Sequence, residues 1–410
     1  MVILSVHNTS DIYGASQSIL RVLRRLRLDG HSVHVVLSAP GPLVELLEAH
    51  GVTVHIFESL AIVERAQLGS LAGKIAFCWR YPYSALWLSA LILRLKVDVV
   101  HTNTAVMPAP AVAAWITRRR HLWHLREFSS EFRGVWKFYQ RYIWRLSERI
   151  ITISDAVRDQ FDVELRSRCI TVYNSLGPGA ADIDREAAWR FRESVGDPEL
   201  LIGVIGRIKW VRKGQEVLIK AAALLAERYP EARYLIVGSV AAGNEDHLVR
   251  LKELVAELGL TEKVIFTGDI NNPRDVYAAC DVTVVPSVLP EPFGRVVMES
   301  MAAGTPVIGS RCGGIPEQIS DGETGLLFEP GNERELAVAL EKLTSDGELR
   351  ARMGRAARER ALRMFDDSAT YTKVANVFEG RPRADASYLA SALDEPKRDA
   401  DLVGGSTSRS

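Results

Sequence analysis

The chain reads Leu201-Ile202-Gly203-Val204-Ile205-Gly206-Arg207 near its middle, an apolar run that a glycine and a cation close. Lys213-Gly214 follows six residues later, and the stretch from Gln215 to Arg228 has the spacing of an amphipathic helix. A strand, a loop and a helix in this order predict a unit of a parallel α/β sheet. The cations Arg207 and Lys213 would neutralise a departing diphosphate; a solvated basic loop is the alternative.

A second segment sets two carboxylates around the start of a helix that we predict over 296–303: Pro290-Glu291-Pro292-Phe293-Gly294-Arg295-Val296-Val297-Met298-Glu299. Glu291 is expected in the loop, because prolines and Gly294 flank it, and Glu299 in the second helical turn. A helix N-terminus exposes unpaired N–H groups and a partial positive charge, which suit a phosphate. Acids on either side would hold hydroxyl groups, an arrangement that fits a nucleotide-sugar.

Apolar runs alternate with helical stretches up to about residue 365, the rhythm of repeated βαβ units. We therefore expect an α/β protein with two doubly wound, Rossmann-like domains, over 1–175 and 200–363, joined by a linker over 176–199. Residues 381–410 lose the apolar rhythm and are expected to be disordered. The predicted strands are Met1 to Val6, Val33 to Ser38, Asp98 to Thr102, Leu122 to Leu125, Arg149 to Ser154, Leu201 to Ile205, Arg233 to Val237, Lys263 to Thr267, Val282 to Val285 and Pro306 to Gly309.

Charge and composition narrow the function classes. The 410 residues include 51 basic and 51 acidic side chains, a balance that argues against a nucleic-acid binder. Residues 1–150 alone carry 18 basic and 10 acidic side chains, which points to an anionic partner or membrane surface on that side. The four cysteines lack disulfide or zinc spacing, so a reducing cytosol is expected. The longest apolar stretch, Ser84 to Leu95, is shorter than the about 20 residues that span a membrane, and we expect a buried helix there.

Single residues add weaker signals. His124 stands at the end of a predicted strand, where residues of a cleft gather, whereas its rival His121 stands at the strand's start. Gly14 lies in a polar loop and would let the backbone approach a phosphate or sugar, or would simply form a turn. Asp182-Ile183-Asp184 falls in the linker, and no other metal-ligand spacing occurs, so we expect no metal. The chain has neither of the glycine-rich phosphate loops of dehydrogenases and P-loop NTPases.

Cations and aromatic residues are interleaved over residues 133–145. The pattern fits a helix lying on a membrane surface, and it also fits a helix that packs its aromatic residues into the first domain. Both interpretations stay open, and Arg118-Arg119-Arg120 adds to the basic charge of this half. The interleaved residues are Arg133, Lys137, Arg141 and Arg145 with Trp136, Tyr139, Tyr142 and Trp144.

The chain resembles the retaining glycosyltransferases of family 4 from residue 1 to about residue 380. The motifs that carry the resemblance are Gly206-Arg207 with Lys213-Gly214, Phe266-Thr267-Gly268, Pro286-Ser287, Glu291-Pro292-Phe293-Gly294, Glu299-Ser300-Met301-Ala302-Ala303-Gly304-Thr305-Pro306-Val307, Gly313-Gly314-Ile315-Pro316-Glu317 and Gly325-Leu326-Leu327-Phe328. Weaker matches in the first half are Asp98-Val99-Val100-His101, Thr152-Ile153-Ser154 and Val172-Tyr173-Asn174-Ser175.

The resemblance implies the GT-B architecture, with the acceptor bound by the first domain, the nucleotide-sugar by the second, and a helix over 364–380 returning to the first. It implies that Glu291 contacts hydroxyl groups of the donor sugar and Glu299 those of the ribose. Arg207 and Lys213 would neutralise the diphosphate. The other residues it implies are Phe293, Gly294, Arg295, Ile270 and Gly14 for the donor, His124 for the donor sugar or reacting centre, and Asn103 and Arg126 on the acceptor side. In the family's Gly-Gly loop Gly14 is the second glycine, and Tyr13 replaces the first.

The expected function is transfer of a hexose from a UDP- or GDP-sugar to an acceptor hydroxyl, with retention and without a metal or cofactor. The acceptor would be a lipid or growing polysaccharide at the inner membrane surface, and the protein cytoplasmic, with peripheral membrane contact left open. In this family the departing phosphate is generally held to take the acceptor's proton, so Glu291 is not expected to act as a nucleophile. The alternatives are a sugar-nucleotide epimerase of the same architecture and a non-catalytic nucleotide-sugar-binding module.

Overall fold

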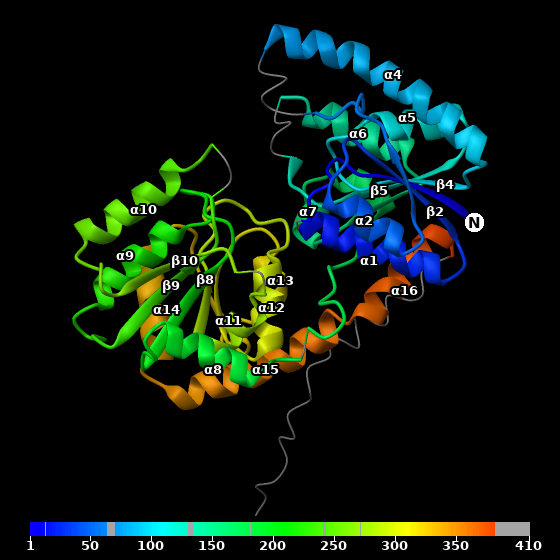
Figure 1. Ribbon diagram of the computed structural model, residues 1–410. Coiled ribbons are helices and arrows are strands. Elements are labelled where there is room, and N and C mark those ends of the chain that lie inside the picture. The colour runs from blue at the N-terminus through cyan, green and yellow to red at the C-terminus, as the bar shows by residue number, and fades with distance from the viewer. Residues whose placement is uncertain are drawn as a thin grey trace, which may run out of the picture.

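The computed structural model describes residues 1–12, 14–63, 70–129, 134–180, 182–240, 243–270 and 272–381. Tyr13, Arg133 and the predicted tail after Arg381 lie outside these residues. The described residues form two parallel sheets with helices around them, one in each half of the chain (Figure 1). This is the predicted pair of Rossmann-like domains. Within the described ranges, no helix is long and apolar enough to cross a membrane.

The first sheet has the strand order β3-β2-β1-β4-β5-β6-β7, and all its pairs are parallel. In chain order its strands are β1 (Val2–Val6), β2 (Ser32–Leu37), β3 (Thr53–Ile56), β4 (Val99–Thr102), β5 (Arg120–Leu125), β6 (Arg149–Thr152) and β7 (Cys169–Thr171). The two edge strands, β3 and β7, were not predicted. Both are short, and neither is a fully buried apolar run, so neither carries the pattern of a central parallel strand.

Helices cover both faces of this sheet (Figure 1). One side packs around Leu23 and Phe378, and the other around Leu88 and Met107. The helices of this half are α1 (Gly14–Leu28), α2 (Pro42–Ala49), α4 (Leu71–Leu95), α5 (Ala109–Ile116), α6 (Trp136–Leu146), α7 (Asp155–Asp159) and the 3₁₀ helix η2 (Val163–Arg168).

The second sheet has the order β10-β9-β8-β11-β12-β13 and is also parallel. Its strands are β8 (Leu200–Ile205), β9 (Ala232–Val237), β10 (Val264–Gly268), β11 (Val282–Val285), β12 (Val307–Ser310) and β13 (Gly325–Phe328). Its helices are α8 (Arg185–Ser194), α9 (Gln215–Leu225), α10 (Asp246–Glu257), α11 (Arg274–Ala279), α12 (Arg295–Ala303), α13 (Ile315–Gln318), α14 (Glu333–Thr344) and α15 (Gly347–Met364).

The two halves share apolar contacts. One buried cluster joins Ile153 and Leu176 of the first half to Phe293, Val297 and Phe365 of the second. The last helix, α16 (Asp367–Glu379), packs beside α1, and its Phe378 is fully buried in the core of the first half. The two domains are therefore joined by an apolar interface as well as by the connecting segment.

The prediction that Ser84 to Leu95 is a buried helix is wrong in part. The helix α4 starts earlier, at Leu71, and only one of its sides is buried, through residues such as Leu88 and Ile92. Leu86 and Leu93, inside the predicted stretch, are 64% and 58% exposed. The apolar composition of Ser84 to Leu95 correctly indicated that one side of the helix is packed. It could not indicate that apolar residues on a second side of the helix have no packing neighbour.

Candidate functional site

A cavity of about 280 Å³ lies between the two domains, at the carboxyl ends of strands from both sheets. Ligands of open parallel sheets bind at this edge, because the loops that follow the strands gather there. The first domain lines it with Gly14, Ala15, Ser18, Arg126, Ile153 and Asn174. The second contributes residues 204–207, 284–287 and 291–296 together with Lys213 and Gln215.

Lys213 and Glu291 form the central ion pair of this cavity. Lys213 Nζ lies 2.6 Å from Glu291 Oε2, and the Ser287 hydroxyl donates to the same oxygen at 3.4 Å. Both charged side chains keep some exposure, 28% for Lys213 and 17% for Glu291, so they stay accessible to a ligand. The pair joins the two sequence segments that were predicted to carry the chemistry, although they lie far apart in the chain.

Gly214 allows Lys213 to take this position. Its φ is +68°, and a Cβ built on it would lie 1.8 Å from the carbonyl oxygen of Pro286. The loop before α9 therefore runs directly against the end of β11. Any other residue at this point would push Lys213 away from Glu291, because the obstacle is backbone and cannot rotate aside.

The loop after β8 concentrates positive charge. Burial lowers the pKa of Lys209, and the nearby charges of Arg212, Arg207 and Lys213 lower it further. Four cations held this close repel one another, and Glu291 supplies only part of the counter-charge. The loop is thus suited to an anion with more than one negative charge, such as a diphosphate.

The helix α12 begins at the cavity wall. Gly294 caps it in the left-handed conformation, with φ +80°, and Arg295 is its first residue. The first-turn N–H groups of a helix lack intrahelical partners and attract anions. One turn further on, Glu299 accepts hydrogen bonds from Arg295 (Nη2 to Oε1, 2.8 Å) and from the Tyr277 hydroxyl (3.0 Å). Glu299 is thereby held beside the cavity but does not line it.

Arg126 forms the opposite wall, from the first domain. Its Nε donates to Asn103 Oδ1 at 2.8 Å and its Nη1 to Asn174 Oδ1 at 3.0 Å. Burial lowers the pKa of Arg126 to about 9, and Arg21 and Arg295 add to this effect, whereas Glu127 opposes it. Within the described ranges its guanidinium makes no ion pair with a carboxylate. A cation kept buried without a bonded carboxylate is costly unless a ligand uses it.

His124 does end β5, as predicted, but it does not reach this cavity. It lines a smaller neighbouring hollow with Arg21, Tyr371 and residues of α16. Its Nδ1 lies 3.5 Å from Arg126 Nη2, and its Nε2 is buried without a hydrogen-bond partner. Burial, followed by the charge of Arg126, lowers the pKa of His124, so the ring is neutral. His124 therefore contacts Arg126 and lies behind the cavity wall.

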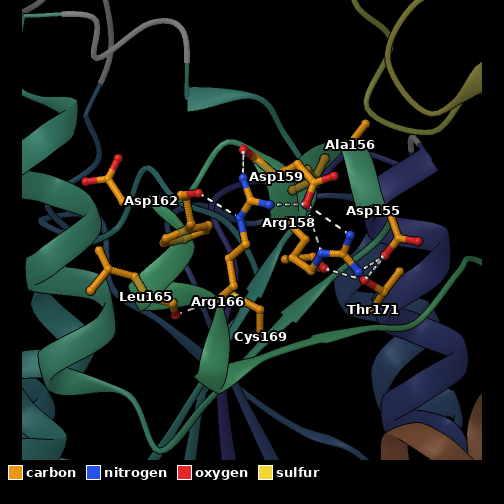
Figure 2. Close-up of polar contacts among 12 residues, drawn as sticks. Asp155, Ala156, Arg158, Asp159, Asp162, Leu165, Arg166, Cys169 and Thr171 are labelled. Carbon is orange, nitrogen blue, oxygen red and sulfur yellow. Dashed lines mark hydrogen bonds and ion pairs between the residues drawn. The ribbon is translucent and has the colours of Figure 1, made fainter. Parts of the chain in front are cut away.

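The helix α7 links the two domains beside the cavity. Glu317 accepts the backbone N–H groups of Asp155 and Ala156, at 2.8 and 2.7 Å. Within α7, Arg158 lies between Asp155 and Asp159 (Figure 2). In the same view Arg166 from η2 also pairs with Asp159, and Thr171 on β7 donates to Asp155 at 2.6 Å (Figure 2). These contacts fix α7 to the first domain. The hydrogen bonds from the first turn of α7 to Glu317 therefore connect the whole first domain to the second.

The structure brings together most, but not all, of the predicted site residues. Those that line the cavity are Glu291, Arg207, Lys213, Phe293, Gly294, Arg295, Gly14 and Arg126. Asn103 is fully buried behind Arg126, and Ile270 is partly buried against the core around Tyr277. Sequence reasoning assigned no role to Gln215, Ser18 or Asn174, which also line the cavity. Asn174 and Ser287 did occur in the motifs that carried the resemblance, and this was the one signal for them.

The aromatic residues of α6 pack inward. Tyr142 donates its hydroxyl to the carbonyl oxygen of Pro108 at 2.7 Å, and Trp136 donates its indole N–H to Gln160 at 3.0 Å. Of the aromatic residues on this helix, Phe138 alone is exposed. The structure thus favours the second interpretation of residues 133–145, packing into the domain; Arg133 lies outside the described residues.

The described residues contain no group of three or more His, Cys, Asp or Glu side chains that could hold a metal ion. Asp184, the second acid of the Asp-x-Asp sequence, caps α8 by accepting the N–H of Ala187 at 2.9 Å. A helix cap is a structural role, and it engages one of the two carboxylate oxygens of Asp184.

Two family models match the chain: Glycosyltransferase Family 4 over residues 12–176, and Glycosyl transferases group 1 over residues 185–360. Among curated proteins, D-inositol 3-phosphate glycosyltransferase of Corynebacterium jeikeium is 36% identical over 221 residues, which make up 50% of this chain and 52% of that protein. The chain spans about half the length of the curated relatives it matches.

Solved structures agree with the fold. HepE of Anabaena, in complex with UDP, has a TM-score of 0.79 and 25% identity, and the match covers 93% of this chain and 100% of that one. HepE is also solved with UDP and glucose. A glycosyltransferase of Rickettsia africae shares the fold, with a TM-score of 0.77 at 22% identity over 92% of this chain and 98% of that one.

Proposed function

Because the chain belongs to glycosyltransferase family 4 and has the GT-B fold, we propose that it transfers a hexose from a UDP- or GDP-sugar to an acceptor hydroxyl, with retention. The observation that carries this proposal is the Lys213–Glu291 pair, set between a cationic loop and the start of α12 in one cavity. Arg207 and Lys213 bind the diphosphate, together with the N–H groups of Gly294 and Arg295. Glu291 accepts from hydroxyl groups of the sugar.

The reaction breaks the bond between the anomeric carbon and the diphosphate oxygen, and the electron pair leaves with the diphosphate. Arg207 and Lys213 stabilise the charge that builds on this leaving group, and this lowers the barrier. The acceptor oxygen forms the new bond on the same face of the sugar, and its proton goes to the departing phosphate oxygen. No separate carboxylate base is needed.

Glu291 suits a binding role better than a nucleophilic one. Lys213 and Ser287 already engage its Oε2, which lowers the nucleophilicity of the carboxylate. When the diphosphate enters, Lys213 moves its contact to the phosphate, and the freed carboxylate oxygen accepts a sugar hydroxyl instead. In the absence of donor, Lys213 and Glu291 thus make with each other the contacts that they make with the diphosphate and the sugar when the donor is bound.

The relatives support a nucleotide-sugar donor. HepE was solved with UDP, and the curated relative of Corynebacterium jeikeium is named D-inositol 3-phosphate glycosyltransferase. For this chain we propose a lipid-linked or polysaccharide acceptor at the inner membrane surface. The protein would be cytoplasmic and held at the membrane by its basic first domain, and it would use no metal or cofactor.

The experiment that tests the proposal measures sugar transfer by Lys213→Ala and Glu291→Gln. Each change should lower kcat/KM by about a hundredfold or more, because a group that binds the transition state is lost. The matched controls, Lys342→Ala on α14 and Glu359→Gln on α15, remove exposed charges that do not line the cavity and should retain full activity. Normal turnover by both site variants would overturn the assignment.

Incubation with UDP-N-acetylglucosamine and no acceptor separates the rival functions. An epimerase would convert the sugar without an acceptor. A binding module would bind donors, as a rise in melting temperature reports, yet transfer nothing to any acceptor. Neither result is expected.

A further inference from the structure

The helix α4 is apolar on more than one side. Ala85, Leu88 and Ile92 face the core of the first domain and are buried. A second stripe, about a third of a turn away on the helix, faces outward with Leu71 and Trp79 about three-quarters exposed, at 75% and 76%. The whole outward stripe consists of Leu71, Ile75, Trp79, Tyr83, Leu86 and Leu93.

The end of α5, which packs against α4, exposes two more apolar residues. Trp115 is 68% and Ile116 48% exposed, at the last residues of the helix. The helices α4 and α5 pack together, and each leads into one of the adjacent parallel strands β4 and β5. Their last turns therefore lie at the same edge of the sheet. We call the outward stripe of α4 together with Trp115 and Ile116 the α4–α5 surface.

The chain segment that carries the α4–α5 surface is basic, with Glu58 beside Arg80 and Glu148 paired with Arg120 as the neighbouring acids from other segments. Residues 71–95 contain Lys74, Arg80 and Arg94 but no Asp or Glu. Lys96, Arg118 and Arg119 follow at the ends of the two helices, and none of the three is buried. Between residues 70 and 120 the single acid is Asp98, which accepts the backbone N–H of Val2 at 2.8 Å. An exposed apolar stripe framed by cations matches the boundary of an anionic bilayer.

We propose that the α4–α5 surface is the membrane-binding face of this protein and takes an anionic phospholipid bilayer. Trp79 and Tyr83 have the amphipathic rings that settle at the headgroup level. The leucines reach the acyl boundary, and Lys74, Arg94, Arg118 and Arg119 meet the lipid phosphates. A second copy of the chain is a poorer occupant, because a symmetric contact would set two cationic surfaces against each other.

The position of α4 connects this face to the cleft. The helix α4 leads into β4 and runs antiparallel to it, so the start of α4 lies towards the carboxyl edge of the sheet (Figure 1). The cavity lies at this same edge. The helices α1 and α16 cover the opposite face of the sheet, so α4 is free to lie on a surface (Figure 1). A bilayer on α4 would hold a lipid-linked acceptor beside the cavity. This inference deepens the proposed membrane contact and rests on it, but not on the transfer chemistry.

The test is flotation of the full chain with vesicles, without donor or acceptor, so that failure here leaves the transfer proposal untouched. The chain should bind vesicles of phosphatidylcholine mixed with phosphatidylglycerol, and hardly bind phosphatidylcholine alone. The double variant Trp79→Ser/Leu86→Ser should bind about tenfold more weakly or worse, since two apolar anchors are lost. Lys74→Glu/Arg94→Glu should weaken binding comparably, and added salt should weaken binding of the unchanged chain.

The matched control is Leu224→Ser/Val338→Ser, which removes two apolar residues of the second domain that are 56% and 67% exposed. It should bind like the unchanged chain. Equal binding by the control and the Trp79→Ser/Leu86→Ser variant would overturn the proposal, and so would a lack of binding to anionic vesicles. A dimer in size-exclusion chromatography that dissociates in the Trp79→Ser/Leu86→Ser variant would also overturn it, in favour of a second copy.

Discussion

Ser154 donates its hydroxyl to the carbonyl oxygen of Pro292 at 2.6 Å, from the first domain to the loop that carries Glu291. The same hydroxyl oxygen accepts the N–H of Val157 and caps α7. The carbonyl of Glu291 in turn accepts the N–H of Gly314, one turn before Glu317 reaches back to α7. The position of Glu291 therefore depends on how the two domains meet.

Ser154→Ala should lower kcat/KM for transfer by about three- to tenfold, because the loop of Glu291 loses its hydrogen bond to the first domain. The melting temperature should fall as well, since the cap of α7 contributes about 1 kcal/mol. Asp346→Ala is the control: it removes the cap of α15, where Asp346 accepts from Leu349 at 2.8 Å, far from the domain boundary. The control should lose similar stability and keep its activity. Equal kinetics in the two variants would show that the Ser154 bond does not position Glu291.

Gly214→Ala tests the close approach behind Lys213. An alanine there must shift the loop, because its Cβ would overlap the Pro286 carbonyl, so Lys213 leaves Glu291 and transfer should fall by at least about tenfold. Gly259→Ala is a matched control: Gly259 has the same φ, +68°, but nothing within 4 Å of its Cβ position. It should lose only the about 1–2 kcal/mol of the left-handed conformation and retain its kinetics. If both variants turn over equally, the overlap has no bearing on Lys213.

The βαβ rhythm predicted the central strands of both sheets to within about two residues, because a strand buried on both faces must be continuously apolar. It missed β3, whose residues are partly exposed at the sheet edge, and β7, which is three residues long. For β13 the sequence offered a motif, Gly325-Leu326-Leu327-Phe328, but no strand was predicted there. Short edge strands form by pairing with a neighbour and carry little pattern of their own.

The second-domain half of the site could be predicted because it is built from local segments, each a strand end followed by a helix start. In the first-domain half the resemblance predicted Gly14 and Arg126, which line the cavity, but it assigned no role to Ser18 or Asn174. His124 and Arg126 both stand at the end of β5, and only packing decides that Arg126 lines the cavity and His124 lies behind it. Ser154 and Glu317 act across the domain boundary, between residues more than a hundred positions from their partners, and no local spacing encodes such a contact.

Arg126→Gln should separate stability from function. Burial disfavours the charge of Arg126, so its removal should change the free energy of unfolding by no more than about 1 kcal/mol. Transfer should nevertheless fall by about tenfold or more, through a higher KM for the acceptor, while the rise in melting temperature caused by the donor stays unchanged. Arg334→Gln, an exposed cation on α14, is the control and should match the unchanged chain. If donor binding falls as much as transfer does, Arg126 binds the donor rather than the acceptor.

Buried histidines should make the first domain sensitive to acid. Burial lowers the pKa of His121 from 6.5 to about 3, and burial together with the charge of Arg126 lowers that of His7 to about 3. Between these values the unfolded chain binds protons that the folded chain does not. Above about pH 6.5 these two histidines therefore do not reduce the free energy of unfolding. As the pH falls from 6.5 toward 3, each histidine lowers the free energy of unfolding by up to about 1.4 kcal/mol per pH unit.

The measurement is urea unfolding at pH 7.5 and in steps below it, followed by circular dichroism. His121→Gln should flatten the dependence on pH by about one proton, although it also loses the hydrogen bond of His121 Nε2 with the Thr102 hydroxyl, 2.9 Å long. Val97→Ala, a change at a fully buried apolar residue of the same domain, should lower stability by a similar amount at every pH and leave the slope unchanged. A slope in His121→Gln as steep as in the unchanged chain would mean that His121 takes up its proton without unfolding.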